Sequence, residues 1–174
     1  MEANGVVNED LDRRFQLRHP GVNMSTLPAE VLDWQSRGAR VQVFGRDVFV
    51  FEAGKEHEEK LLILHGFPTS SFDFHRVLPH FAKRFHVVVH DHLRFGLSDN
   101  PRDYSYSLVE QAEVAMELWR KLGIKKGHLL AHDYGTSVAT EVLARREKGG
   151  CPVELQTVTL ANGSVFIELE IGRA

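Results

Sequence analysis

The second half of the chain contains a short run whose residue types could supply a covalent nucleophile. Residues 129–136 read Leu-Leu-Ala-His-Asp-Tyr-Gly-Thr, an apolar segment followed by polar side chains and a glycine. This order predicts a buried strand that turns sharply into a helix, with Asp133 at the turn. The small residues Ala131 and Gly135 would allow the strand and the helix to pack closely. A carboxylate held at such a turn can attack an electrophilic carbon and form an ester.

A simpler interpretation of Asp133 stays open. Asp often caps a helix, because its side chain accepts hydrogen bonds from the first helical amides. His132 is adjacent to Asp133, but neighbouring side chains across a sharp turn are expected to point apart. His132 and Gly135 are therefore interpreted as supporting residues of the turn.

A second motif follows the apolar run 61–64 and consists of His65, Gly66, Phe67 and Pro68. In an open α/β sheet, ligands bind beyond the carboxyl ends of the strands, where this motif and Asp133 both lie. Gly66 permits an unusual backbone and Pro68 fixes the chain after Phe67, so the Phe67 N–H could face a ligand. With the Tyr134 N–H it would form an oxyanion hole. The alternative is an ordinary strand-to-loop turn, which His65 would brace.

A third motif, residues 91–99, reads Asp-His-Leu-Arg-Phe-Gly-Leu-Ser-Asp and also follows an apolar run. His90 and His92 would share one face of an extended segment, which raises the possibility of a metal site with Asp91. No third ligand has a clear spacing, so structural histidines are the favoured interpretation. No metal and no cofactor are predicted.

Composition limits the class of protein. The chain has 174 residues, is 43% hydrophobic and carries a net charge of -3, which fits one soluble domain with a core. It is not basic enough to indicate nucleic-acid binding. No apolar run could span a bilayer, and the first residues do not resemble a secretion signal. Cys151 is the one cysteine, so no internal disulfide can form, and a cytoplasmic location is expected.

The hydrophobic pattern predicts an α/β fold. Residues 41–50 alternate around a turn at residues 45–47, which is typical of an antiparallel hairpin. Apolar runs that fit strands covered on both faces occur at 61–64, 86–89, 127–130 and 158–160. Helices are predicted at 27–34, 72–81 with a break near Pro79, 108–122 and 135–148. Ser107 with Glu110 predicts a capping box, and Gly123 a helix end. The expected sheet is mostly parallel, with right-handed crossovers.

Together, the three motifs resemble the α/β-hydrolase superfamily, in the branch of epoxide hydrolases and haloalkane dehalogenases. Residues 65–68 resemble its oxyanion segment, residues 91–99 its Asp-x-x-Gly-x-Gly-x-Ser segment, and residues 131–136 its aspartate elbow. The sequence of residues 64–71 and 132–135 is also similar to that of the mesoderm-specific-transcript group of these hydrolases. The resemblance implies a small apolar substrate, Asp133 as nucleophile, and the Phe67 and Tyr134 amides as oxyanion hole.

Two departures from the dehalogenase pattern affect the expected activity. Dehalogenases of this branch usually have Trp after the nucleophile and Asn or Glu after His-Gly, and both help to hold the halide. Tyr134 and Phe67 occupy these positions here. The His-Gly-Phe-Pro motif is more typical of epoxide hydrolases, in which cap-domain tyrosines activate the epoxide. The resemblance therefore favours an epoxide hydrolase-like enzyme, with a dehalogenase-like enzyme as the alternative.

The order of the motifs also implies that part of the domain is missing. In this superfamily the acid and the histidine follow the nucleophile along the chain. None of the ten histidines lies after His132. We therefore expect a polar arm at 1–25, the N-terminal part of a hydrolase domain at 26–166, and a truncated tail at 167–174, ending before the cap and the last strands. Turnover by this chain alone is not expected, and a non-catalytic ligand-binding or partner-binding protein is a further alternative.

Overall fold

The computed structural model describes residues 27–163 of the chain. The predicted arm at 1–25 and the predicted tail at 167–174 lie outside the described residues, as do both ends of the predicted hydrolase part. None of the helices between residues 27 and 163 is long and apolar enough to cross a membrane.

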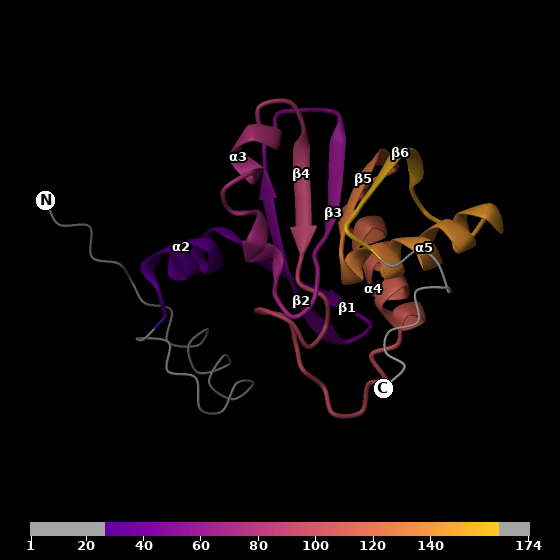
Figure 1. Cartoon of the computed structure of the whole chain (residues 1–174), viewed down its shortest axis with the longest axis horizontal. Coiled ribbons are helices and arrows are strands. Elements are labelled where there is room, and N and C mark those ends of the chain that lie inside the picture. The colour runs from indigo at the N-terminus through magenta and orange to yellow at the C-terminus, as the bar shows by residue number, and fades with distance from the viewer. Residues whose placement is uncertain (1–26, 164–174) are drawn as a thin grey trace, which may run out of the picture.

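The described residues form one mixed sheet of six strands in the order β1-β2-β4-β3-β5-β6 (Figure 1). The strands are β1 (Ala39–Val43), β2 (Arg46–Ala53), β3 (Lys60–Leu64), β4 (His86–His90), β5 (Lys126–His132) and β6 (Glu154–Ala161). β2 pairs antiparallel with β1 and β4. The pairs β3–β4, β3–β5 and β5–β6 are parallel. The predicted mostly parallel sheet with an antiparallel start is confirmed.

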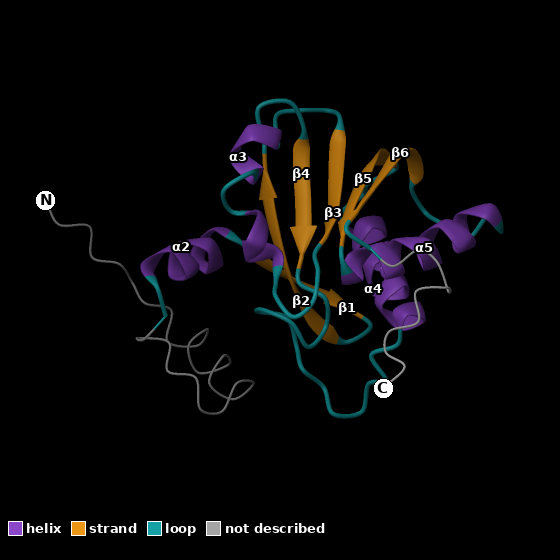
Figure 2. Ribbon diagram, viewed as in Figure 1, coloured by secondary structure: helices purple, strands orange, loops and turns teal. Residues whose placement is uncertain are grey.

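Helices cover the two faces of this sheet (Figure 2). They are α2 (Ala29–Arg37), the short 3-10 helix η2 (Ser71–Phe74), α3 (Leu78–Phe81), α4 (Leu108–Lys121) and α5 (Tyr134–Glu147). The β3 residues Leu62 and Leu64 pack with α4 and α5 in one core, whereas Leu61 and Ile63 pack with α2 and α3 in the other. Both faces of β3 are thus covered, which explains why its sequence is continuously apolar.

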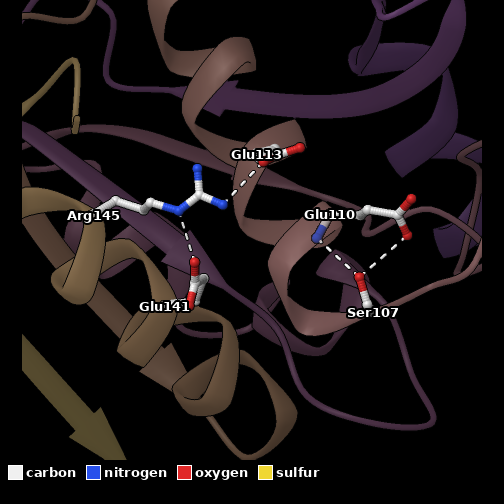
Figure 3. Close-up of polar contacts among 5 residues, drawn as sticks. All are labelled: Ser107, Glu110, Glu113, Glu141 and Arg145. Atoms are coloured by element: carbon white, nitrogen blue, oxygen red, sulfur yellow. Dashed lines mark hydrogen bonds and ion pairs between the residues drawn. The ribbon is translucent and has the colours of Figure 1, made fainter.

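Polar contacts fix the start of α4 and join it to α5 (Figure 3). The Ser107 Oγ accepts the Glu110 N–H at 3.2 Å and donates to Glu110 Oε2 at 3.2 Å. The helix begins as predicted, but the capping box is only half formed, because the Ser107 N–H donates to the Ser105 hydroxyl instead. Arg145 of α5 binds Glu141 at 2.7 Å and Glu113 of α4 at 3.0 Å. This bridge holds the two helices side by side.

Two sequence predictions about local structure differ from the observed fold. The predicted helix 72–81 is two short pieces, and its break lies before Pro79, which occupies the first turn of α3. Pro fits a helix start because the missing N–H would have no helical partner there. The strand predicted at 158–160 exists, but most side chains of β6 are exposed and only Leu155 is buried. Within residues 27–163, β6 is the last strand at its edge of the sheet and has a neighbouring strand on one side only. Its side chains are therefore less covered than those of the central strands.

We predict that the 174-residue chain self-associates through the outer edge of β6. An unpaired strand edge beside an exposed apolar side chain is a pairing site for other chains, and Leu160 on this strand is 37% exposed. Leu160→Lys should therefore shift the chain toward a monomer in size-exclusion chromatography with light scattering. Phe44→Lys, at the 64% exposed tip of the β1–β2 hairpin, is the matched control and should leave the association unchanged. A wild-type chain that is a monodisperse monomer would contradict the prediction.

Candidate active site

Asp133 lies at a strained turn between β5 and α5. Its backbone angles are φ 49° and ψ -120°, a region that side-chain-bearing residues rarely adopt. The Asp133 N–H donates to the Ala161 carbonyl at 3.0 Å, and the Thr136 N–H donates to the Asp133 carbonyl at 2.9 Å. These contacts on both sides of the residue hold the turn in its unfavourable conformation.

The carboxylate of Asp133 does not cap α5. Asp133 occupies the N-cap position of α5, but its side chain makes no capping hydrogen bond there, so the simpler interpretation of its carboxylate as a helix cap is wrong. Instead, the Phe67 N–H donates to Asp133 Oδ2 at 2.8 Å. The Phe67 amide, and then the adjacent Tyr134 amide, lowers the pKa of Asp133 below its ordinary value of 3.8. The carboxylate is therefore ionised at neutral pH, and the Phe67 amide is bound to it.

Two glycines allow β3, β5 and α5 to approach one another this closely. A Cβ on Gly66 would lie 2.8 Å from the Asp133 Cβ. A Cβ on Gly135 would lie 2.5 Å from the Leu64 carbonyl oxygen and 2.8 Å from that of His65. All three distances are shorter than a real Cβ shows to its neighbours, so the site requires glycine at these positions.

His65 braces the loop that carries the Phe67 amide. Its ring is fully buried, its Nε2 accepts the His92 N–H at 3.0 Å, and its Nδ1 lies 2.8 Å from the Gly66 carbonyl oxygen. Since Nε2 accepts a hydrogen bond, the proton of the neutral ring is on Nδ1 and is donated to Gly66. Pro68 follows Phe67 at the exposed end of this loop.

His132 and Asp133 both lie beside Gly66. The His132 Nδ1 and the Asp133 Oδ2 are each 3.1 Å from the position that a Cβ would take on Gly66. Within the described residues, no hydrogen bond joins the two side chains, so His132 is not linked to the carboxylate.

Aromatic rings of the three motifs contact one another. Phe67 is 64% exposed, and its ring meets Phe95 edge-on with centroids 6.1 Å apart. The Tyr134 ring lies 5.9 Å from Phe95 and 5.6 Å from His92. Phe95 thus links the Phe67 ring to the ring that follows Asp133.

The comparisons with known proteins agree with this geometry. The α/β hydrolase fold family matches residues 60–171, more than half of the chain. The chain belongs to this family. It is 42% identical over 138 residues to the putative hydrolase LipZ of Mycobacterium tuberculosis, covering 79% of the chain and 47% of LipZ. It is 41% identical over 114 residues to the mouse mesoderm-specific transcript protein, covering 63% of the chain and 34% of that protein.

Solved structures give the same assignment. The crystal structure of the haloalkane dehalogenase DbeA from Bradyrhizobium elkani superposes with a TM-score of 0.65 and 30% identity, covering 72% of this chain and 41% of that one. The chain spans less than half the length of each of these three relatives. The recognition of an α/β-hydrolase branch from three short motifs is therefore confirmed.

In this member of the α/β hydrolase fold family, the motif at residues 91–99 is a structural brace. Asp91 is buried, and its two carboxylate oxygens accept the Ser71 N–H and the Leu97 N–H, both at 2.7 Å. Gln111 of α4 donates to the Leu93 carbonyl at 3.0 Å and accepts its N–H at 3.2 Å. The sequence analysis missed Gln111, although a polar residue on the inward face of an amphipathic helix is the signal that could have identified it.

The possible metal site at His90, Asp91 and His92 is not assembled. The Asp91 carboxylate is bound to backbone amides, and the rings of His90 and His92 meet edge-on at 5.1 Å. In the part of the chain that the structure describes, no group of three or more His, Cys, Asp or Glu side chains could hold a metal ion. A hollow of about 400 Å³ between α2 and α3 is lined by none of the predicted site residues.

We predict that Gly135→Ala strongly destabilises the domain, because the added methyl group would meet two carbonyl oxygens of β3 and its loop. Overpacking of this kind costs about 1–3 kcal/mol in the free energy of unfolding. Gly150→Ala is the control, since its Cβ would lie 3.4 Å from the nearest atom, an ordinary contact distance. Urea denaturation of both variants measures the difference, and equal stabilities would contradict the close approach.

We also predict that Asp91→Asn destabilises the fold. One carboxylate oxygen becomes an NH₂ group that faces a backbone N–H, so a buried donor loses its acceptor, at a cost of about 2–4 kcal/mol. Asp33→Asn is the control, because the Asp33–Arg37 pair is largely exposed. This second change should alter the free energy of unfolding by less than about 1 kcal/mol. Thermal or urea unfolding measures the free energy of unfolding of both variants, and equal losses would contradict the prediction.

Proposed function

We propose that this chain carries the nucleophilic half of an epoxide hydrolase-like enzyme, with Asp133 as a covalent nucleophile. The observation that supports this most is the ionised Asp133 carboxylate at a strained turn, with the Phe67 N–H 2.8 Å from its Oδ2. A carboxylate that only stabilised the fold would not need a strained backbone, and strain of this kind clusters at functional sites.

The proposed first step is alkylation of the carboxylate. Asp133 Oδ1 attacks one carbon of the epoxide ring, the carbon–oxygen bond of the ring breaks, and the resulting alkoxide takes a proton from water. The product is a hydroxyalkyl ester of Asp133. Oδ2 becomes the carbonyl oxygen of this ester and keeps its hydrogen bond from Phe67.

The proposed second step is hydrolysis of the ester. Water adds to the carboxyl carbon, and the negative charge that develops on Oδ2 is stabilised by the Phe67 and Tyr134 amides. The bond between the carboxyl carbon and the ester oxygen then breaks, the diol leaves with the proton that a base took from the water, and the carboxylate of Asp133 forms again. This step needs a base to take the proton of the water, which in this family follows the nucleophile along the chain. No histidine follows His132 in the 174 residues, so the ester should accumulate in this chain.

Dehalogenation is the second candidate function, because the chain is similar to haloalkane dehalogenases in sequence and in structure. The same carboxylate would displace a halide instead of opening an epoxide. Phe67 and Tyr134 occupy the positions after His-Gly and after Asp133, where dehalogenases of this branch usually hold the halide. The Phe67 side chain has no hydrogen-bond donor to hold a departing halide. This difference favours the epoxide.

We predict that incubation with 1,2-epoxyhexane adds one epoxide mass to the chain, mapped by mass spectrometry to Asp133. Asp133→Asn should abolish the adduct, whereas Asp103→Asn, which removes an exposed carboxylate, should leave it unchanged. A parallel incubation with 1-bromohexane tests dehalogenation and should give less adduct. Sustained release of the diol would refute the absence of turnover, and no adduct from either reagent would favour the alternative of a non-catalytic binding protein.

A further inference from the structure

Three buried histidines lie behind the candidate site and form a cluster of contacting rings. His65, His90 and His92, which we call the histidine cluster, each have 0% exposure. The ring centroids of His65 and His92 are 4.4 Å apart, and those of His90 and His92 are 5.1 Å apart. Within residues 27–163, no hydrogen-bond partner lies at either ring nitrogen of His90 or His92. Buried polar atoms without partners are costly and rare, so the cluster requires an explanation.

The histidine cluster is connected to both amides of the candidate site. His65 links it to the Phe67 amide, because its ring holds the Gly66 carbonyl on one side and the His92 N–H on the other. The His92 ring also lies against the Tyr134 ring, with centroids 5.6 Å apart. A change in the protonation or hydrogen bonding of the cluster would therefore alter the loop that directs the Phe67 N–H toward Asp133.

Protonation of the cluster is unfavourable in the closed structure. A proton on His65 would occupy Nε2 and break the hydrogen bond from the His92 N–H. Burial, and then the neighbouring His65, lowers the pKa of His90 to about 3. Burial, followed by the other two rings, also lowers the pKa of His92 well below its ordinary value of 6.5.

The charged groups around the cluster only partly offset the lowering of the histidine pKa values by burial. Asp91 and Asp73 favour a positive charge on His65, but burial outweighs them and the pKa of His65 is still lowered. The Asp91 carboxylate is already bound to two backbone amides. The titratable side chains on the elbow side are His132, Asp133 and Tyr134.

We propose that the histidine cluster positions the Phe67 amide only while all three rings are neutral, and that acid opens this loop by protonating them. The proposal depends on the proposed function only in treating the Phe67 amide as part of the reactive site. In an open loop the exposed rings would have the ordinary pKa of 6.5, so the open form binds protons that the closed form excludes. Opening is therefore favoured as the pH falls below about 6.5, by up to about tenfold per pH unit for each histidine.

Hydrogen exchange of the Phe67 amide, measured by NMR on the 174-residue chain, tests this proposal. After correction for the intrinsic rate, the open population of the wild-type loop should rise steeply between about pH 6 and about pH 4. His92→Phe and, separately, His90→Phe each remove one titrating ring while keeping an aromatic one. Each should reduce the open population about 30-fold at about pH 5. The control His80→Phe removes an exposed histidine on α3 and should leave the pH dependence unchanged.

The amide of Leu129 in the central strand β5 separates local opening from unfolding of the whole domain. The proposal requires the Phe67 amide to have a larger open population than the Leu129 amide across this pH range in the wild-type chain, and this comparison holds even where a variant fails to fold. Equal open populations at the two amides, which would mean that Phe67 exchanges only when the whole domain unfolds, or an unchanged pH dependence at Phe67 in both variants, would overturn it. No electrophile is used, so a failure of covalent labelling at Asp133 leaves this result unaffected.

Discussion

The hydrogen bond between the Phe67 N–H and Asp133 Oδ2 is the contact on which the arrangement of the site depends. It joins two loops at the ends of neighbouring parallel strands, β3 and β5. The strands fix the spacing of these loops, but the loops can meet only where neither carries a Cβ in the gap. Gly66 and Gly135 satisfy this condition on the two sides of the contact. The energy that stabilises the sheet thereby also holds the strained backbone of Asp133 in place.

The loops behind this contact are held mainly by side chains that bind backbone groups. Asp91, Gln111 and Ser98 each bind main-chain atoms of distant segments, and all three are buried. Such contacts satisfy polar groups that irregular backbone would otherwise leave unpaired in the core. His65 performs the same task with one ring, in a single tautomer. Hydrogen bonds from side chains to backbone groups thus fix the loops behind the site.

The sequence predicts the parts of the fold that depend on local pattern, and fails where distant contacts decide. The apolar runs at β3, β4 and β5 were identifiable because both faces of these strands are covered. The exposure of β6 does not follow from the local pattern alone, since it depends on what else covers the sheet. Glycines at residues 66 and 135 indicated a tight turn, but the partner of the Phe67 amide required the register of β3 with β5. The orphaned nitrogens of His90 and His92 could not be read from sequence, because burial and the lack of partners are properties of the packed core.

The hydrogen bond from the Asp133 N–H to the Ala161 carbonyl has a consequence for synthesis of the chain. Ala161 is the last residue of β6 and follows α5 in the sequence. When α5 has left the ribosome, β3, β4 and β5 can already pair, but the amide of Asp133 still lacks its acceptor. Since domains are made from the N-terminus onward, the turn gains this acceptor only after β6 has emerged and paired with β5. The Asp133 turn therefore reaches its final geometry after most of the described sheet has formed.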